Sequence, residues 1–146
     1  MEQQNNKFNW KKIIGPCIVV LIPIVGTIWS NRRIDYVKKN GVWSIMTVDK
    51  VYAAHRGTSF KCHYKFRDKV YKNTGGLVDY SDEGKRFFLL LIPADPERVL
   101  YTEHRVPSWF TLEAPSEGWS SRPTEAELRK LQNEADSIQN IKLNKN

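Results

Sequence analysis

The chain has 146 residues, of which 23 are Lys or Arg and 16 are Asp or Glu, so its formal net charge is +7. This length holds one small domain with accessory segments. The 27% of charged and 12% of aromatic residues argue against a disordered chain, and two cysteines cannot build a disulfide framework. A basic chain invites a nucleic-acid function, so the location of the excess charge matters.

More than half of this excess lies at the N-terminus, where residues 1–33 carry +4. This segment contains 19 consecutive uncharged residues, of which the apolar run 13–29 would span about 26 Å as a helix. Aromatic and basic residues that suit a bilayer interface flank the run: Trp10, Lys11, Lys12, Trp29, Arg32 and Arg33. The pattern predicts an N-terminal tail at 1–12 and a single transmembrane helix at 13–30, anchored in the cell membrane.

Two alternatives to the anchor are a cleaved signal peptide and a buried soluble helix. The apolar run is longer than a usual signal-peptide core, and no small-residue cleavage site follows it. Its hydrophobicity on all sides and its doubly basic flanks are unusual for a buried soluble helix. The anchor is therefore the favoured interpretation. The positive-inside count gives three cations on one side and four on the other, so it does not decide which side the C-terminal domain occupies.

After a polar connector at 31–40, the body at 41–106 has the pattern of β-strands. Residues 42–52 are rich in β-branched and aromatic side chains and predict a long first strand. Residues 60–67 alternate strictly, which predicts one buried and one solvated face. The first face carries Phe60, Cys62, Tyr64 and Phe66; the second carries Lys61, His63, Lys65 and Arg67.

Further strand signals follow at short intervals. A tight turn at Asp68 and Lys69 leads into a third strand at 70–74, and a loop or bulge at the glycine pair 75–76 precedes a short segment at 77–80. The apolar run 86–92 predicts a strand covered on both faces, and 99–102 predicts a last short strand. The fold class is therefore mainly β, with a small five-stranded SH3-like or OB-like barrel between the transmembrane helix and a C-terminal amphipathic helix.

The spacing of glycine, aromatic and proline residues in this body resembles that of uncharacterised bacterial membrane-anchored β domains over about residues 41–105. The residues that carry the resemblance are a Gly-opened strand with Val48, Tyr64, Phe66, Val70, Tyr71, Gly84, Phe87, Phe88 and the run 92–96, Ile-Pro-Ala-Asp-Pro. Leu90 or Leu91 stands where that pattern has Tyr. The resemblance implies a bacterial membrane protein and brings no catalytic residues.

Two segments follow the body. Residues 107–123 hold three prolines with Trp109, Phe110 and Trp119, which predicts a strap across the barrel in preference to a free linker. Thr124 and Glu127 form a capping box at the start of residues 124–146. Apolar residues at helical spacing then predict an amphipathic helix from about 125 to 141, which would pack on the barrel or pair with a second copy of the chain.

The residues that carry chemistry in enzymes do not form a known catalytic or metal-binding pattern here. Cys62 and His63 are neighbours on a strand and so point to opposite faces. No metal, nucleotide or hydrolase motif is present in the sequence. The sequence therefore predicts no catalytic residue, no metal ligand and no cofactor-binding residue, and the protein is not expected to be an enzyme.

One basic surface suggests a partner. A patch on and after the alternating strand comprises Lys61, His63, Lys65, Arg67, Lys69 and Lys72. It is interpreted as a solvated face, as a contact for anionic lipid or an acidic protein, or, least favoured, as a nucleic-acid surface.

The expected protein is a single-pass membrane-anchored interaction or assembly module of the bacterial envelope that contacts the bilayer and another envelope protein. The alternative is a secreted or periplasmic ligand-binding or enzymatic domain released by cleavage.

Overall fold

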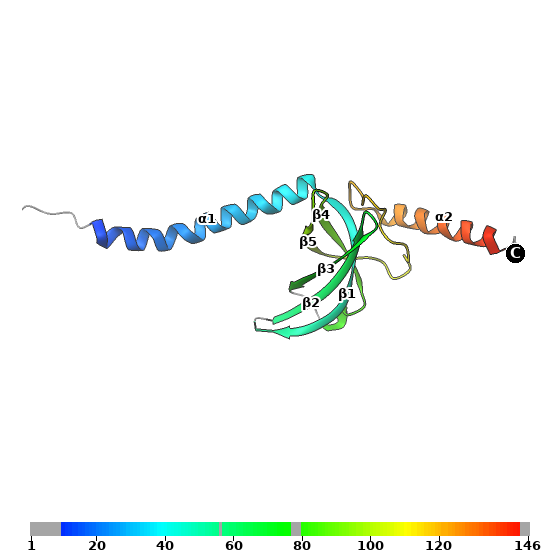
Figure 1. Cartoon of the computed structure of the whole chain (residues 1–146), viewed down its shortest axis with the longest axis horizontal. Helices are drawn as coiled ribbons and strands as arrows, with labels where there is room; N and C mark the ends of the chain where they lie inside the picture. Colours follow the sequence, from blue (N-terminus) through cyan, green and yellow to red (C-terminus); the bar gives the residue numbers. More distant parts are fainter. Residues whose placement is uncertain (1–9, 56, 77–79, 144–146) are drawn as a thin grey trace, which may run out of the picture. The chain divides into compact units, whose positions relative to one another are not determined.

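The computed structural model of the chain describes residues 10–55, 57–76 and 80–143; within these ranges it leaves out the side chains of residues 10–22, 24, 80, 142 and 143. The chain divides into two compact units, Met1–Tyr36 and Val37–Asn146. The elements, labelled in Figure 1, are α1 (Trp10–Asn40), β1 (Val42–Ala54), β2 (Gly57–Phe66), β3 (Lys69–Gly76), the 3-10 helix η1 (Tyr80–Asp82), β4 (Arg86–Ile92), β5 (Asp95–Arg105) and α2 (Glu125–Leu143).

The second unit is built on one antiparallel sheet with the strand order β3-β2-β1-β4-β5. Strands β1 to β3 follow one another through hairpins, and β4 returns to lie beside β1, which is a Greek-key arrangement. The sheet curls into a half-barrel (Figure 1). The predicted mainly β domain of five strands is confirmed at this level.

The two edge strands of the half-barrel, β3 and β5, share no backbone ladder among the described residues. Side chains link them and their neighbours instead. The Tyr64 hydroxyl donates to the Pro96 carbonyl at 2.9 Å, the Asn73 amide donates to the Glu97 carbonyl at 3.1 Å, and the Tyr101 hydroxyl donates to the Thr74 carbonyl at 3.3 Å. We call this region the seam.

The inner face of the half-barrel carries the main core. The predicted alternation in β2 is confirmed, since Phe60, Cys62, Tyr64 and Phe66 are all at most 2% exposed. Residues from β1 and β4 complete the cluster: Met46, Val48, Val51, Phe87, Leu89 and Leu91. Gly75 belongs to this packing, because a Cβ there would lie 2.4 Å from the buried Phe60 ring. This close approach explains a glycine within β3, where the sequence predicts a loop or bulge.

The outer face carries a second core that the strap covers. Phe110 is 1% exposed and packs with Ile45, Phe88 and Leu128. Trp119 forms an isolated bridge with Trp43 of β1, its N–H donating to the Trp43 carbonyl at 2.9 Å. In Figure 1 the strap, drawn in yellow, leads from the sheet to α2. Because both faces of β4 are covered, its residues 87–92 are all buried, as its unbroken apolar run predicts.

Several boundaries differ from the sequence prediction. The turn between β2 and β3 is at Arg67 and Asp68, both with positive φ, one residue earlier than predicted. β5 is longer than predicted and includes Pro96, which an edge strand tolerates because proline's missing donor can face away from the ladder. The residues of the predicted connector, 31–40, are the last part of α1. Of the short segment predicted at 77–80, residues 77–79 lie outside the described residues and Tyr80 begins η1.

Helix α2 begins with the predicted capping box. The Thr124 N–H donates to a Glu127 carboxylate oxygen at 2.7 Å, and the Glu127 N–H approaches the Thr124 hydroxyl oxygen at 3.4 Å. The Thr124 hydroxyl also donates to that carboxylate oxygen at 2.8 Å, and the two hydrogen bonds that Thr124 donates lower the pKa of the Glu127 carboxyl. Along the helix Leu128 is buried, whereas Ile138 and Ile141 are more than half exposed. The first turns of α2 therefore pack on the domain, and pairing of its later turns with a second copy stays a prediction.

Candidate functional site

The outer face of the sheet brings the polar residues of four strands into one row. The register places His63 of β2 opposite Thr47 of β1 and Lys72 of β3, and Thr47 opposite Arg86 of β4. Directly opposed residues point to the same face of a sheet. The row Lys72, His63, Thr47 and Arg86 therefore crosses the outer face beside the strap.

The predicted basic patch is only partly assembled by the fold. Lys61, His63, Lys65 and Lys72 share the outer face. Arg67 lies in the hairpin turn instead of in the strand. Lys69 pairs in register with the inward-facing Phe66, and its Nζ lies 5.0 Å above the Tyr71 ring centre. The sequence-based patch therefore includes one residue of the opposite face, because the hairpin turn falls one residue earlier than predicted.

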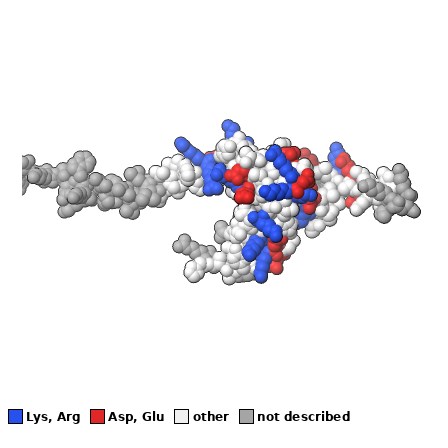
Figure 2. Space-filling model, in the orientation of Figure 1, with Lys and Arg blue, Asp and Glu red and all other residues white. Residues whose placement is uncertain are grey.

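Acidic residues of the strap neutralise one end of the patch. Lys65 Nζ lies 3.4 Å from Glu113 Oε2, and Arg67 forms a 3.0 Å ion pair with Glu117. The Arg67 N–H also donates to the Ser116 carbonyl at 2.8 Å. In Figure 2, red acidic side chains lie beside many of the blue basic ones on the face in view. The sequence could not place these acids, since about 50 residues separate them from their partners.

His63 has an acidic neighbour that the sequence analysis also did not use. The β1–β2 ladder is irregular between Val48 and Lys50, so Asp49 is the extra residue of a β-bulge. Its Oδ1 lies 2.5 Å from His63 Nδ1. The bulge therefore turns an acidic side chain toward the outer-face histidine.

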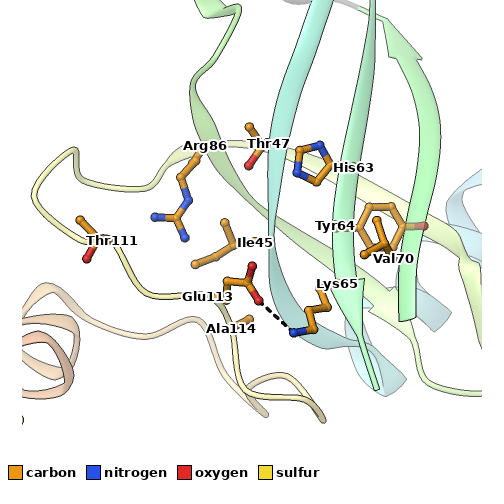
Figure 3. A pocket seen from close by; sticks show the side chains of 10 residues that line it. All are labelled: Ile45, Thr47, His63, Tyr64, Lys65, Val70, Arg86, Thr111, Glu113 and Ala114. Atoms are coloured by element: carbon orange, nitrogen blue, oxygen red, sulfur yellow. Dashed lines mark ion pairs between the residues drawn. The ribbon is translucent and has the colours of Figure 1, made fainter. Parts of the chain in front are cut away.

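Between β2 and the strap lies a pocket of about 330 Å³, seen closely in Figure 3. Ile45 and Val70 contribute apolar walls, and His63, Lys65 and Arg86 contribute basic groups. Lys65 and Glu113 point toward one another across it, as the dashed line in Figure 3 marks. The strap thus forms one wall of the pocket and supplies its carboxylate.

Arg86 connects this pocket to the strap. One guanidinium nitrogen donates to the Phe110 carbonyl at 2.6 Å and a second donates to the Leu112 carbonyl. Burial lowers the pKa of Arg86, and the Glu113 charge acts in the opposite direction. An arginine remains charged in proteins in spite of such shifts. The guanidinium therefore serves to hold the strap, and the charged groups of the pocket are satisfied largely by the protein itself.

The adjacent acids Asp82 and Glu83 make structural contacts. Asp82 is 5% exposed, and its carboxylate accepts from Arg105 at 2.7 Å and from Lys85 at 3.3 Å. The carboxylate of Glu83 accepts the Val51 N–H at 3.0 Å. Within the described part of the chain, no group of three His, Cys, Asp or Glu residues is placed to hold a metal ion.

Cys62, which the sequence places in the core, is buried on the inner face and separated by the sheet from the outward-facing His63. Burial raises the pKa of its thiol to about 11, and burial likewise raises the pKa of Tyr64 to about 12 and that of Tyr101. The thiolate population of Cys62 in the native state is thus about a hundredfold lower than in the unfolded chain.

We therefore expect Cys62 to resist iodoacetamide at pH 8 until urea unfolds the domain, with the modified peptide identified by mass spectrometry. Because all three pKa values are raised in the folded state, the protonated groups contribute their full stabilisation below about pH 9. This contribution is lost as the pH rises through the folded-state pKa values of about 11 and 12, because the unfolded chain loses these protons more readily. The midpoint of urea unfolding should fall over that range. Rapid native-state alkylation, or an unchanged midpoint at pH 11, would contradict the burial of these groups.

The structure describes the side chains of only three of the six residues predicted to lie at the bilayer interface. Trp29 is 78% exposed, and Arg32 and Arg33 are exposed as well. The side chains of Trp10, Lys11 and Lys12 lie outside the described ones, as do those of most of the predicted span. Among the residues that the structure describes, no helix combines the length and the apolar character that a membrane crossing requires.

Comparison of the chain with protein-family models, with curated proteins and with solved structures found no match.

Proposed function

We propose that the chain is a single-pass membrane protein whose half-barrel domain is a non-enzymatic interaction or assembly module of the bacterial envelope. The observation that carries this proposal is the uncharged run of 19 residues between Lys12 and Arg32, flanked by basic residues and tryptophans. The whole run falls within the single helix α1. Apolar side chains of its described part, including Val25 and Ile28, are at least half exposed, which suits contact with lipid.

An interaction role is favoured over catalysis by the outer face of the domain. In the pocket, Lys65 is paired with Glu113, and His63 is paired with Asp49 at its rim. An activated nucleophile needs a base within hydrogen-bond reach, and the thiol of Cys62 is on the other side of the sheet from His63. The groups present can bind and orient a partner.

The finer fold assignment that we propose is an OB-like barrel. Five strands, a Greek key and a partly open sheet are the features of that class. Barrels of this class bind ligands over the face of strands 2 and 3. In this chain that face carries Lys61, His63 and Lys72. The outer face of β2 and β3 is therefore our proposed interaction surface.

The membrane anchor is tested by placing a charge in the middle of the apolar run. An arginine at the centre of a span costs about 2.5–3.5 kcal/mol, which is roughly a hundredfold in the insertion equilibrium. We expect the full chain to stay in the membrane pellet after a high-salt and carbonate wash. The Leu21→Arg variant should shift to the supernatant, and Leu21→Ala should stay in the pellet.

Retention of Leu21→Arg in the pellet would contradict the anchor. N-terminal sequencing of the recovered protein tests the alternative of a released domain. A mature chain that begins near Asn31 and is found in the soluble fraction would replace the anchor with a cleaved signal peptide.

A further inference from the structure

Three lysines of the outer face have no partner among the described residues. Lys50, Lys61 and Lys72 are exposed, and their side chains form no ion pair or hydrogen bond with any residue that the structure describes. The acids near them are used by other groups: Asp49 pairs with His63, and Glu113 pairs with Lys65. The strap therefore divides the basic surface into a neutralised part and an unpaired part.

The sheet register places these three lysines close together. Lys50 is the direct partner of Lys61 across the β1–β2 ladder. Lys72 pairs with His63, so it is the diagonal neighbour of Lys61. Directly opposed side chains have Cβ atoms about 5 Å apart and diagonal ones about 7–8 Å apart. Like charges directly opposed across a ladder are destabilising, and an external anion relieves that repulsion.

We propose that Lys50, Lys61 and Lys72 form a contact site for the phosphate groups of anionic phospholipids at the bilayer surface. This inference rests on the proposed membrane anchor, which would hold the domain near lipid. Val42 comes nine positions after Arg33, so the first strand begins at most about 32 Å along the chain from the last basic flank of the apolar run. Each lysine near an anionic surface contributes about 1 kcal/mol, which corresponds to about fivefold in binding.

The composition of this face favours lipid over nucleic acid. Single-stranded nucleic acids are held by basic grooves together with exposed aromatic rings on which bases stack. On the described outer face, Tyr52 lies two residues along β1 from Lys50, and it is half-buried. In register, Lys61 lies opposite Thr74, and Lys72 lies opposite His63, whose ring is held by Asp49. The lysines of this surface suit phosphate groups, but the described surface does not offer a row of exposed rings on which bases could stack.

The test uses the full chain reconstituted into vesicles of zwitterionic lipid, with or without 30% phosphatidylglycerol. A membrane-impermeant amine reagent modifies exposed lysines, and mass spectrometry measures each site. We expect the modification of Lys50, Lys61 and Lys72 to fall about fivefold in the anionic vesicles at low salt. Lys130 of α2 is the internal control and should change little. Half-molar salt should restore modification, because screening weakens contacts between surface charges.

A matched pair of variants tests whether the three lysines act together. Lys61→Gln should weaken the protection of Lys50 and Lys72 in anionic vesicles, whereas Lys130→Gln should leave it unchanged. Equal modification in both kinds of vesicle would overturn the lipid site. Protection by inorganic phosphate or by an added oligonucleotide in zwitterionic vesicles, without an effect of anionic lipid, would also overturn it. If the chain fails to remain with any vesicle, the anchor itself is wrong; if it remains without protection, only this inference fails.

Discussion

Replacing Phe110 by alanine is expected to lower the free energy of unfolding of residues 37–146 by about 3–5 kcal/mol. The ring is 1% exposed and packs between the outer face of the sheet and the first turns of α2, against Ile45, Phe88 and Leu128. Its removal leaves a cavity that three different elements line, so no single element can move to fill it. The measurement is urea-induced unfolding followed by circular dichroism.

Two variants make this result specific to the strap. Phe110→Leu keeps most of the apolar volume and should cost less than half as much, which preserves a folded protein if the alanine variant does not fold. Ser108→Ala changes an exposed neighbour in the strap and should leave the midpoint within experimental error. An alanine variant at position 110 as stable as the parent would show that the strap does not contribute to the core.

Replacing Arg86 by methionine is expected to cost about 3 kcal/mol, although the substitution keeps a side chain of similar length. The guanidinium donates to the carbonyls of Phe110 and Leu112, and each hydrogen bond from a charged donor contributes about 1.5–3 kcal/mol. Methionine leaves both carbonyls without these donors beside an apolar face. The loss should appear both in the urea midpoint and in faster proteolysis within the strap.

Arg86→Lys is the matched control for this prediction. A lysine keeps the positive charge beside Glu113, but its single ammonium group does not reproduce the planar fork that reaches two carbonyls. It should restore about half of the lost stability. A lysine variant as unstable as the methionine variant would show that the geometry, and not the charge, accounts for the whole effect. A methionine variant of full stability would contradict the role of Arg86 in holding the strap.

The local pattern of the sequence was sufficient for the parts of the fold that depend on neighbours. Alternation predicted which residues of β2 point inward, the apolar run predicted that β4 is covered on both faces, and the capping box predicted the start of α2. Boundaries depended on contacts that the sequence does not display. The extent of β5 past Pro96 depends on its position at an edge, and Gly75 is explained only by the ring of Phe60 beneath it.

The candidate site was less predictable because its charges come from distant segments. A count of charges near β2 finds only Asp68 as an acid between positions 50 and 72, whereas the fold adds Glu113 and Glu117 from the strap. The one-residue difference in the hairpin turn moved Lys69 to the other face. Sequence order therefore overestimated the size of the basic surface, and the strap decides which lysines stay unpaired.

The seam gives the half-barrel a preferred place to open. Backbone ladders join β3 to β2, β2 to β1, β1 to β4 and β4 to β5, whereas β5 is joined to β3 by the Asn73 amide and the Tyr101 hydroxyl, and to β2 by the Tyr64 hydroxyl. Separation of β5 from β3 and β2 breaks these three side-chain hydrogen bonds and no ladder bond among the described residues, so it is a local opening that leaves the backbone ladders of the sheet intact. Until that opening occurs, the same bonds occupy edge carbonyls that another chain would otherwise pair with, which gives this open sheet protection against edge-to-edge aggregation.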